Sequence, residues 1–146
     1  MIRNIPIKFT QDEVLEIVNE SFCGQFDYFY LPRDNKTQCG VGFAFINFMH
    51  PLFIVDFYIQ FNLIKWSDKI QRCNSNKYCE ITYANVQGLD EIKAELADKN
   101  IMKKVDGSKG PQFYRDLEIN EERLHEIRSR YENDPDLIYQ QLYRLE

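Results

Sequence analysis

The stretch Val41–Phe48 (Val-Gly-Phe-Ala-Phe-Ile-Asn-Phe) places aromatic rings on both faces of any β-strand that it forms. Side chains of a strand alternate between its faces, so Phe43 and Phe45 share one face while Ala44, Ile46 and Phe48 share the other. The second set suits a hydrophobic core. A sheet with helices on its back needs no rings on its open face for folding. Exposed rings suit single-stranded nucleic acid, because each base can stack on an aromatic ring with a gain of about 1–3 kcal/mol.

The composition is typical of one folded domain. The chain has 146 residues, of which 44% are hydrophobic and 14% aromatic, and this argues against disorder throughout. Its four cysteines are widely spaced, so we expect reduced thiols and no metal site. No uncharged apolar run approaches the roughly 18 residues of a membrane span, and a strand expected at the very start leaves no room for a signal peptide. The formal net charge of −5 counts against nucleic-acid binding, since most such domains carry a basic excess.

Residues 1–84 predict four strands and two helices in the order β-α-β-β-α-β. The expected strands are residues 1–6, 27–31, 41–48 and 79–84, and the expected helices run over residues 10–21 and onward from residue 51. Thr10 and Glu13 form a capping box, and Pro51 suits the first position of a helix. Right-handed crossovers would place the first and third strands side by side in the middle of the sheet. The outward residues of these two strands would then be neighbours: Met1, Arg3, Phe43 and Phe45.

Beyond Gly88 the pattern changes to amphipathic helices. One helix is expected to end near Asn100, with Leu89, Ile92 and Leu96 on one side. A turn-rich linker follows at 105–111. Two charged helices are expected after it, with the narrow apolar stripes Leu124, Ile127 and Tyr131, then Ile138, Leu142 and Leu145. We therefore expect a domain over residues 1–102 and a helical tail over residues 103–146 that packs on the domain or on a protein partner.

A family resemblance rests on several motifs. Residues 41–48 resemble the octamer of the RNA recognition motif (RRM), and residues 1–6 resemble its hexamer. A closer similarity, to the C-terminal RRM of the Mei-two-like meiosis regulators, covers residues 1 to about 102. It is carried by Met1–Pro6, Phe29–Pro32 (Phe-Tyr-Leu-Pro), Cys39–Phe48, Trp66 and Cys79–Gly88. Two positions depart from the general RRM pattern and resemble this subfamily: Val41 replaces a basic residue, and Met1 replaces an aromatic one.

The resemblance implies an α+β, ferredoxin-like fold, with a four-stranded antiparallel sheet and two helices on one face. It also implies single-stranded RNA as the partner, a role in meiosis or development, and a place in the nucleus, the cytoplasm or both. We expect no cofactor, metal, membrane or small-molecule substrate. The residues expected to contact RNA are Met1, Arg3, Tyr28, Tyr30, Lys36, Phe43, Phe45, Thr82, Asn85 and Gln87.

Each expected RNA contact has a structural alternative. Phe43 and Phe45 would stack on bases, unless the tail or a partner covers them. Tyr28 and Tyr30 would extend the stacking surface or pack at the sheet edge. The basic residues would bind phosphates or only be solvated, Thr82 would contact a base or a ribose, and Asn85 and Gln87 would hydrogen-bond base edges or end the strand in a turn. Trp66 is expected in the core, because an indole buries a large area.

Two functions therefore stay open. The first is a single-stranded RNA-binding module. The second is a protein-interaction RRM in a larger assembly, supported by the acidic balance, by Val41 and by the helices of the tail. An enzyme is not expected, because His50 and His125 are far apart in sequence and neither has a partner of catalytic type.

Overall fold

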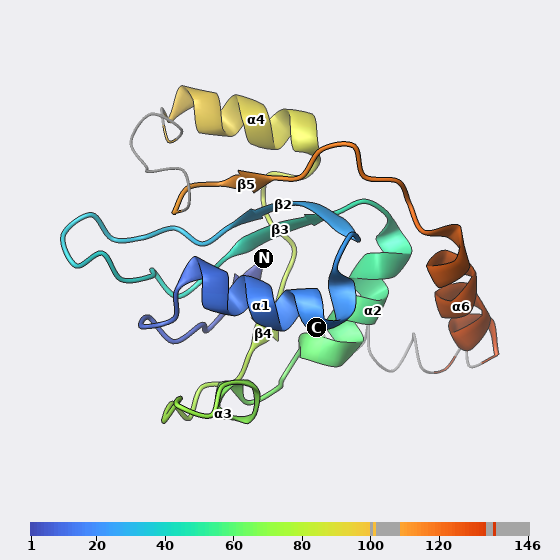
Figure 1. Cartoon of the computed structure of the whole chain (residues 1–146), viewed down its shortest axis with the longest axis horizontal. Helices are drawn as coiled ribbons and strands as arrows, with labels where there is room; N and C mark the ends of the chain where they lie inside the picture. The colour runs from blue at the N-terminus through green and yellow to red at the C-terminus, as the bar shows by residue number, and fades with distance from the viewer. Residues whose placement is uncertain (100, 102–108, 134–135, 137–146) are drawn as a thin grey trace.

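Helices α1 and α2 pack on one face of an antiparallel sheet in the computed structural model of the chain (Figure 1), which describes residues 1–99, 101, 109–133 and 136. The strands are β1 (Ile2–Arg3), β2 (Phe26–Tyr30), β3 (Phe45–Phe48), β4 (Glu80–Ile81) and β5 (Gln112–Phe113). The helices are α1 (Gln11–Phe22), α2 (Pro51–Phe61), α3 (Trp66–Lys69), α4 (Leu89–Asp98) and α6 (Glu121–Glu132). The predicted RRM fold is confirmed.

The sheet consists of two parts that meet at one bridge. Strand β1 pairs with β4, and β3, β2 and β5 form the other part, all antiparallel. The parts join where Ile2 and Ala44 exchange backbone N–H···O bonds of 2.8 and 2.9 Å. Strands β1 and β3 are therefore central neighbours, as predicted. The strands predicted at 1–6, 41–48 and 79–84 are all shorter than expected, and β5, which adds to the edge of β2, was not predicted.

Helices α1 and α2 begin with the predicted capping box and the predicted proline. Thr10 Oγ1 accepts a 3.2 Å bond from the Glu13 backbone, and Glu13 Oε2 accepts a 2.9 Å bond from the Thr10 backbone. At α2, Pro51 occupies the first turn and His50 Nδ1 accepts from the Leu52 N–H at 3.1 Å. The sequence pattern predicted the proline but not the histidine cap.

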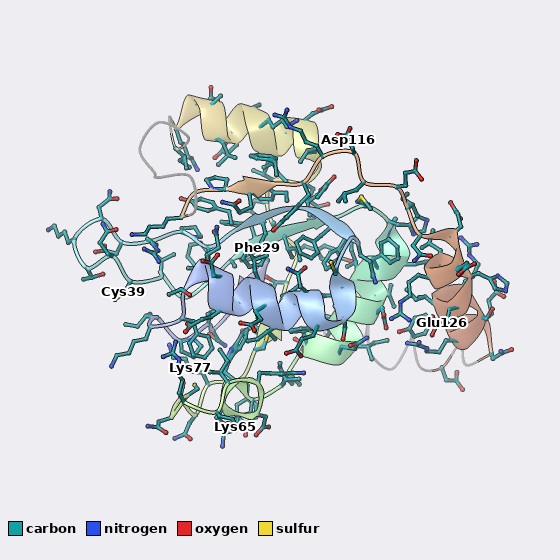
Figure 2. The ribbon with its side chains drawn as sticks, viewed as in Figure 1. Phe29, Cys39, Lys65, Lys77, Asp116 and Glu126 are labelled. Carbon is teal, nitrogen blue, oxygen red and sulfur yellow. The ribbon has the colours of Figure 1, made fainter. Side chains whose placement is uncertain are left out.

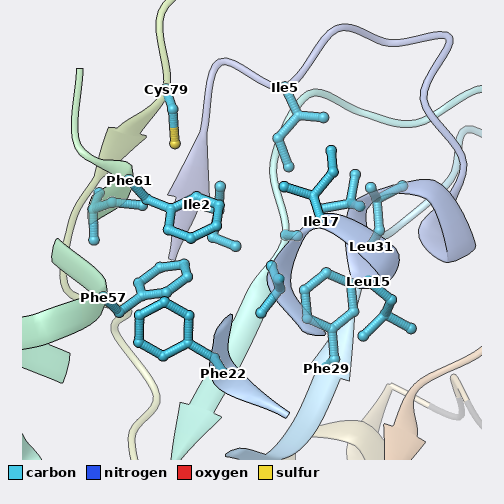
Figure 3. Close-up of a cluster of buried hydrophobic side chains, with 14 of the residues drawn as sticks. Ile2, Ile5, Leu15, Ile17, Phe22, Phe29, Leu31, Phe57, Phe61 and Cys79 are labelled. Carbon is cyan, nitrogen blue, oxygen red and sulfur yellow. The ribbon is translucent and has the colours of Figure 1, made fainter. Parts of the chain in front are cut away.

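The core lies between the sheet and helices α1 and α2. Figure 3 shows Phe22, Phe57 and Phe61 packed around Ile2, and the rings of Phe57 and Phe61 stack with their centroids 4.5 Å apart. Trp66 is fully buried and meets Phe9 edge-on at 5.8 Å. The prediction of Trp66 as a core residue is confirmed.

Helix α6 packs against the outer side of α2 (Figure 1). Its apolar stripe, Leu124, Ile127 and Tyr131, is buried with Phe53 of α2. This part of the tail therefore covers α2 and does not cover the sheet face opposite α1 and α2. The predicted stripe of Ile138, Leu142 and Leu145 and most of the predicted linker lie outside the described residues.

Three findings bear on the function class. The four cysteines are all free thiols, and burial raises the pKa of the Cys79 thiol to about 12. Within the described residues, no group of three or more His, Cys, Asp or Glu side chains could hold a metal ion. Among the helices that the structure describes, none is long and apolar enough to cross a bilayer.

Candidate nucleic-acid interface

Phe43 and Phe45 lie side by side on the sheet face opposite α1 and α2. Their ring centroids are 5.5 Å apart at an interplanar angle of 73°, and both residues are half-buried. Ala44, between them, is fully buried in the main core. Phe43 precedes β3, in a segment where Gly42 adopts a φ of +94° and its carbonyl accepts a 2.9 Å bond from the Ile5 N–H. The alternation predicted from the sequence is confirmed.

Helix α4 covers the neighbouring strand on the same face. Tyr28 and Tyr30 are only 3% and 8% exposed, in a cluster with Ile92 and Leu96 of α4. Phe113 of β5 packs against the ring of Tyr28 at 5.1 Å. Burial raises the pKa of both tyrosines. Tyr28 and Tyr30 are therefore covered by α4 and do not lie on an open surface, although both line the cavity described next, and β5 rather than β2 forms the edge of the sheet.

A cavity of about 620 Å³ lies next to the phenylalanine pair, between the sheet, residues 82–88 and α4. We call it the α4 cavity. Phe43 and Phe45 line it from the sheet, and Ile92 and Leu96 line it from the helix. One basic residue of the described part, Lys99, lines the cavity, and its Nζ lies 2.5 Å from Glu95. The interface is thus an aromatic cavity with little positive charge.

Residues 82–88 supply polar groups to the α4 cavity. Thr82 Oγ1 is buried and has no hydrogen-bond partner within the described part of the chain. Asn85 is exposed, and Gln87 is also exposed, with its Nε2 donating to the Ala84 carbonyl at 3.1 Å. Met1 is half-buried, and its amine donates to the Thr82 carbonyl at 2.7 Å. The structure therefore brings Met1, Thr82, Asn85 and Gln87 together with the two phenylalanines.

The expected phosphate-binding residues do not gather at this cavity. Arg3 is exposed and lies 3.6 Å from Glu80, and it is not among the lining residues. Lys36 is exposed in the long loop that Cys39 marks in Figure 2, away from α4. Lys65 and Lys77 lie around α3, on the opposite side of the view from α4 (Figure 2).

The sequence analysis did not identify α4 as part of the site. The stripe of Leu89, Ile92 and Leu96 predicted an apolar helix face, and that signal is confirmed. It did not indicate which surface the face would cover. The alternation of Tyr28, Phe29 and Tyr30 was a second signal for the position of α4. It placed two large aromatic rings on the sheet face opposite the core, where an apolar helix could cover them.

Comparisons with known proteins agree with the fold. The family model of RNA recognition motif 2 matches residues 1–97. Protein MEI2-like 2 of Oryza sativa subsp. japonica is 40% identical over 102 residues, which are 70% of this chain and 12% of that protein. Protein MEI2-like 1 of Arabidopsis thaliana is 40% identical over 102 residues, 70% of this chain and 11% of that protein.

A third relative is similar over a larger share of the chain. Protein MEI2-like 3 of Oryza sativa subsp. japonica is 35% identical over 116 residues, which are 80% of this chain and 12% of that protein. The chain matches only 11–12% of the length of these three relatives.

Proposed function

Because the chain belongs to the RNA recognition motif 2 family, we propose that it binds single-stranded RNA at the α4 cavity. The observation that carries the proposal is the half-buried pair of Phe43 and Phe45, which lines a cavity on the sheet face opposite the core helices. A base stacked on each ring would gain about 1–3 kcal/mol.

The covered tyrosines limit the number of bases. With Tyr28 and Tyr30 beneath α4, two rings remain for stacking. The footprint we propose is therefore about two nucleotides. Thr82 Oγ1 suits a ribose hydroxyl, because it is a buried polar atom without a partner among the described residues. Asn85 and Gln87 would hydrogen-bond base edges, since their amide groups can both donate and accept.

The charge distribution predicts a weak dependence on salt. The chain carries a net charge of −5, Arg3 and Lys36 do not line the cavity, and Lys65 and Lys77 lie around α3. Few phosphates would then be neutralised, so the logarithm of the binding constant should fall slowly with the logarithm of the salt concentration. Stacking, and not charge, would supply most of the affinity.

A second candidate is a protein-interaction RRM with little or no RNA binding. It is favoured by the apolar lining of the α4 cavity and by Val41, which stands where a general RRM carries a basic, phosphate-binding residue. Burial of apolar side chains from a partner protein would use the same rings without any phosphate contact.

The test measures binding of the full chain to fluorescein-labelled single-stranded RNA by fluorescence anisotropy. The probes are a random-sequence octamer pool and pools of two and four nucleotides. The double variant Phe43→Ala/Phe45→Ala should weaken binding at least about thirtyfold, because two stacking contacts are lost. The matched control is Tyr78→Ala, which removes a ring that is 52% exposed and lies outside the α4 cavity.

Thermal melting of each variant shows whether the fold is retained. Binding lost in the double variant but kept in Tyr78→Ala, with both proteins folded, supports RNA stacking. Equal binding by the wild type and the folded double variant would contradict it. No binding of any probe by the wild-type chain would favour the protein-interaction candidate.

A further inference from the structure

Asn47 continues the row of residues that Phe43 and Phe45 form on the sheet face opposite α1 and α2. Strand residues two positions apart share a face, and Asn47 lines the α4 cavity together with both rings. Two residues of a strand span about 7 Å, which is close to the size of a base. A base stacked on Phe45 can therefore bring its polar edge to the amide of Asn47.

A β-bulge directs the side chain of Asp27 toward Asn47. Phe26 and Tyr28 of β2 pair with consecutive residues of β3, so Asp27 is an extra residue between them. A bulge of this kind turns a side chain away from the regular alternation of the strand. Asp27 Oδ1 accepts a 2.8 Å hydrogen bond from Asn47 Nδ2.

This hydrogen bond determines which way the Asn47 amide faces. A carboxylate only accepts hydrogen bonds, so it holds the Nδ2 side of the amide toward Asp27. The carbonyl oxygen Oδ1 then points away from Asp27, and it accepts no hydrogen bond from the described part of the chain. Asn47 is half-buried and lines the cavity, whereas Asp27 is not a lining residue. The polar atom that faces the cavity from this position is therefore an acceptor.

An acceptor beside a stacked base distinguishes bases by their exocyclic amino groups. Adenine, cytosine and guanine carry an amino group that can donate to Oδ1, and side-chain amides of asparagine pair with the amino group of adenine in this way. Uracil has carbonyl oxygens and a single ring N–H. A carbonyl oxygen placed against Oδ1 gains no hydrogen bond, and the negative charge of Asp27 disfavours it further.

We propose that Asn47 reads the base stacked on Phe45 and selects bases with an exocyclic amino group over uracil. Asp27 is a positioning residue, because it holds the amide with Oδ1 toward the cavity. This selectivity rests on the proposed binding of RNA at the α4 cavity and adds the class of base to it.

The test measures binding of the full chain to fluorescein-labelled RNA tetranucleotides of a single base by fluorescence anisotropy. Adenine is compared with hypoxanthine, and cytosine with uracil. The two bases of each pair have the same ring system, so they stack similarly, and a carbonyl replaces the amino group in the second. The wild type should bind the amino-bearing probe of each pair at least about fivefold more tightly, because one hydrogen bond is gained.

Three variants assign the selectivity to the proposed groups. Asn47→Ala should bring both affinity ratios to within about twofold of one, because the acceptor is removed. Asp27→Asn should lower both ratios too, since the amide that replaces the carboxylate can donate as well as accept and no longer fixes the orientation of Asn47. The matched control is Asn76→Ala, which removes the amide of an exposed residue outside the α4 cavity and should leave both ratios unchanged.

Thermal melting shows whether each variant is folded. If Asn47→Ala does not fold, Asn47→Leu takes its place, because leucine keeps the volume of the side chain and removes the acceptor.

Selectivity for the amino-bearing probes that is lost in the folded Asn47 variant and kept in Asn76→Ala supports the proposal. Equal binding of the two probes of either pair by the wild type would overturn it, and so would unchanged ratios in the folded Asn47 variant. Ratios that stay high in Asp27→Asn would overturn the positioning role of Asp27. RNA binding without selectivity overturns this inference alone, whereas no binding of any probe overturns the RNA-binding proposal as well.

Discussion

The buried carboxylate of Asp56 on α2 provides a quantitative test of how the tail is attached. Asp56 is 1% exposed and accepts hydrogen bonds from three groups of α6: Arg123 Nη2 at 2.9 Å, Arg130 Nη1 at 3.2 Å and Tyr131 Oη at 3.3 Å. Removing one partner of a buried charge is costly, at about 3–5 kcal/mol, because the remaining charge is left without compensation. Arg130 and Tyr131 would still compensate Asp56 in Arg123→Met, so we expect a loss of about 2–3 kcal/mol in the free energy of unfolding.

A double-mutant cycle isolates the ion pair. Asp56→Leu alone should cost about 1–2 kcal/mol, because Arg123 and Arg130 are 22% and 43% exposed at their side chains and can turn toward water. The double variant Asp56→Leu/Arg123→Met should lie within about 1 kcal/mol of the wild type, since replacing a buried ion pair by apolar residues is often neutral. The coupling free energy should then exceed about 1.5 kcal/mol.

Urea denaturation of the four proteins measures these differences. Arg128→Met, at an exposed position of α6, is the control and should change stability by less than about 0.5 kcal/mol. A coupling below about 0.5 kcal/mol would refute the reasoning, because Arg123 and Asp56 would then contribute independently. It would also mean that this ion pair does not hold α6 on α2, and that the buried apolar stripe of α6 does so instead.

Three further predictions concern the sheet and its surroundings. Ile92→Ala should lower the free energy of unfolding by about 2–4 kcal/mol in urea, while Glu91→Gln on the exposed side of α4 changes it little, because Ile92 packs on the buried tyrosines. Burial lowers the pKa of the Met1 amine to about 6, so between pH 6 and 8 the unfolded chain holds more protons on this amine than the folded chain does. The melting temperature should therefore rise with pH across this window, and the rise should be smaller in N-acetylated protein. Iodoacetamide at pH 8 should label Cys23 quickly and Cys79 only on unfolding, as mass spectrometry would show, since Cys23 is exposed whereas burial raises the pKa of Cys79 to about 12.

The local elements of this fold could be predicted from the sequence because their signals are local. The capping box of Thr10 and Glu13 involves residues three positions apart, and Pro51 marks the start of α2 through its own backbone. The alternation around Phe43 and Phe45 follows from the period of a strand. Each of these signals is complete within a few residues, so it can be recognised without knowledge of distant contacts.

The sequence did not predict β5 because the signal for it is not local. Gln112 and Phe113 form a strand of two residues, and only their pairing with Tyr28 and Phe29 defines it. The same holds for His50, whose ring caps α2 only in the rotamer that the fold provides. Such elements depend on tertiary partners that periodicity and propensity do not reveal.

The position of α4 shows why the site was harder to predict than the fold. Its apolar stripe has two possible partners, the open sheet face or another protein, and either would bury Ile92 and Leu96 equally well. The difference decides the function, because packing on Tyr28 and Tyr30 turns an open face into a cavity with two rings left for bases. A helix on a partner protein would have left four aromatic rings free. The size of the proposed RNA footprint therefore depends on one packing contact, between α4 and β2, that the sequence pattern leaves undetermined.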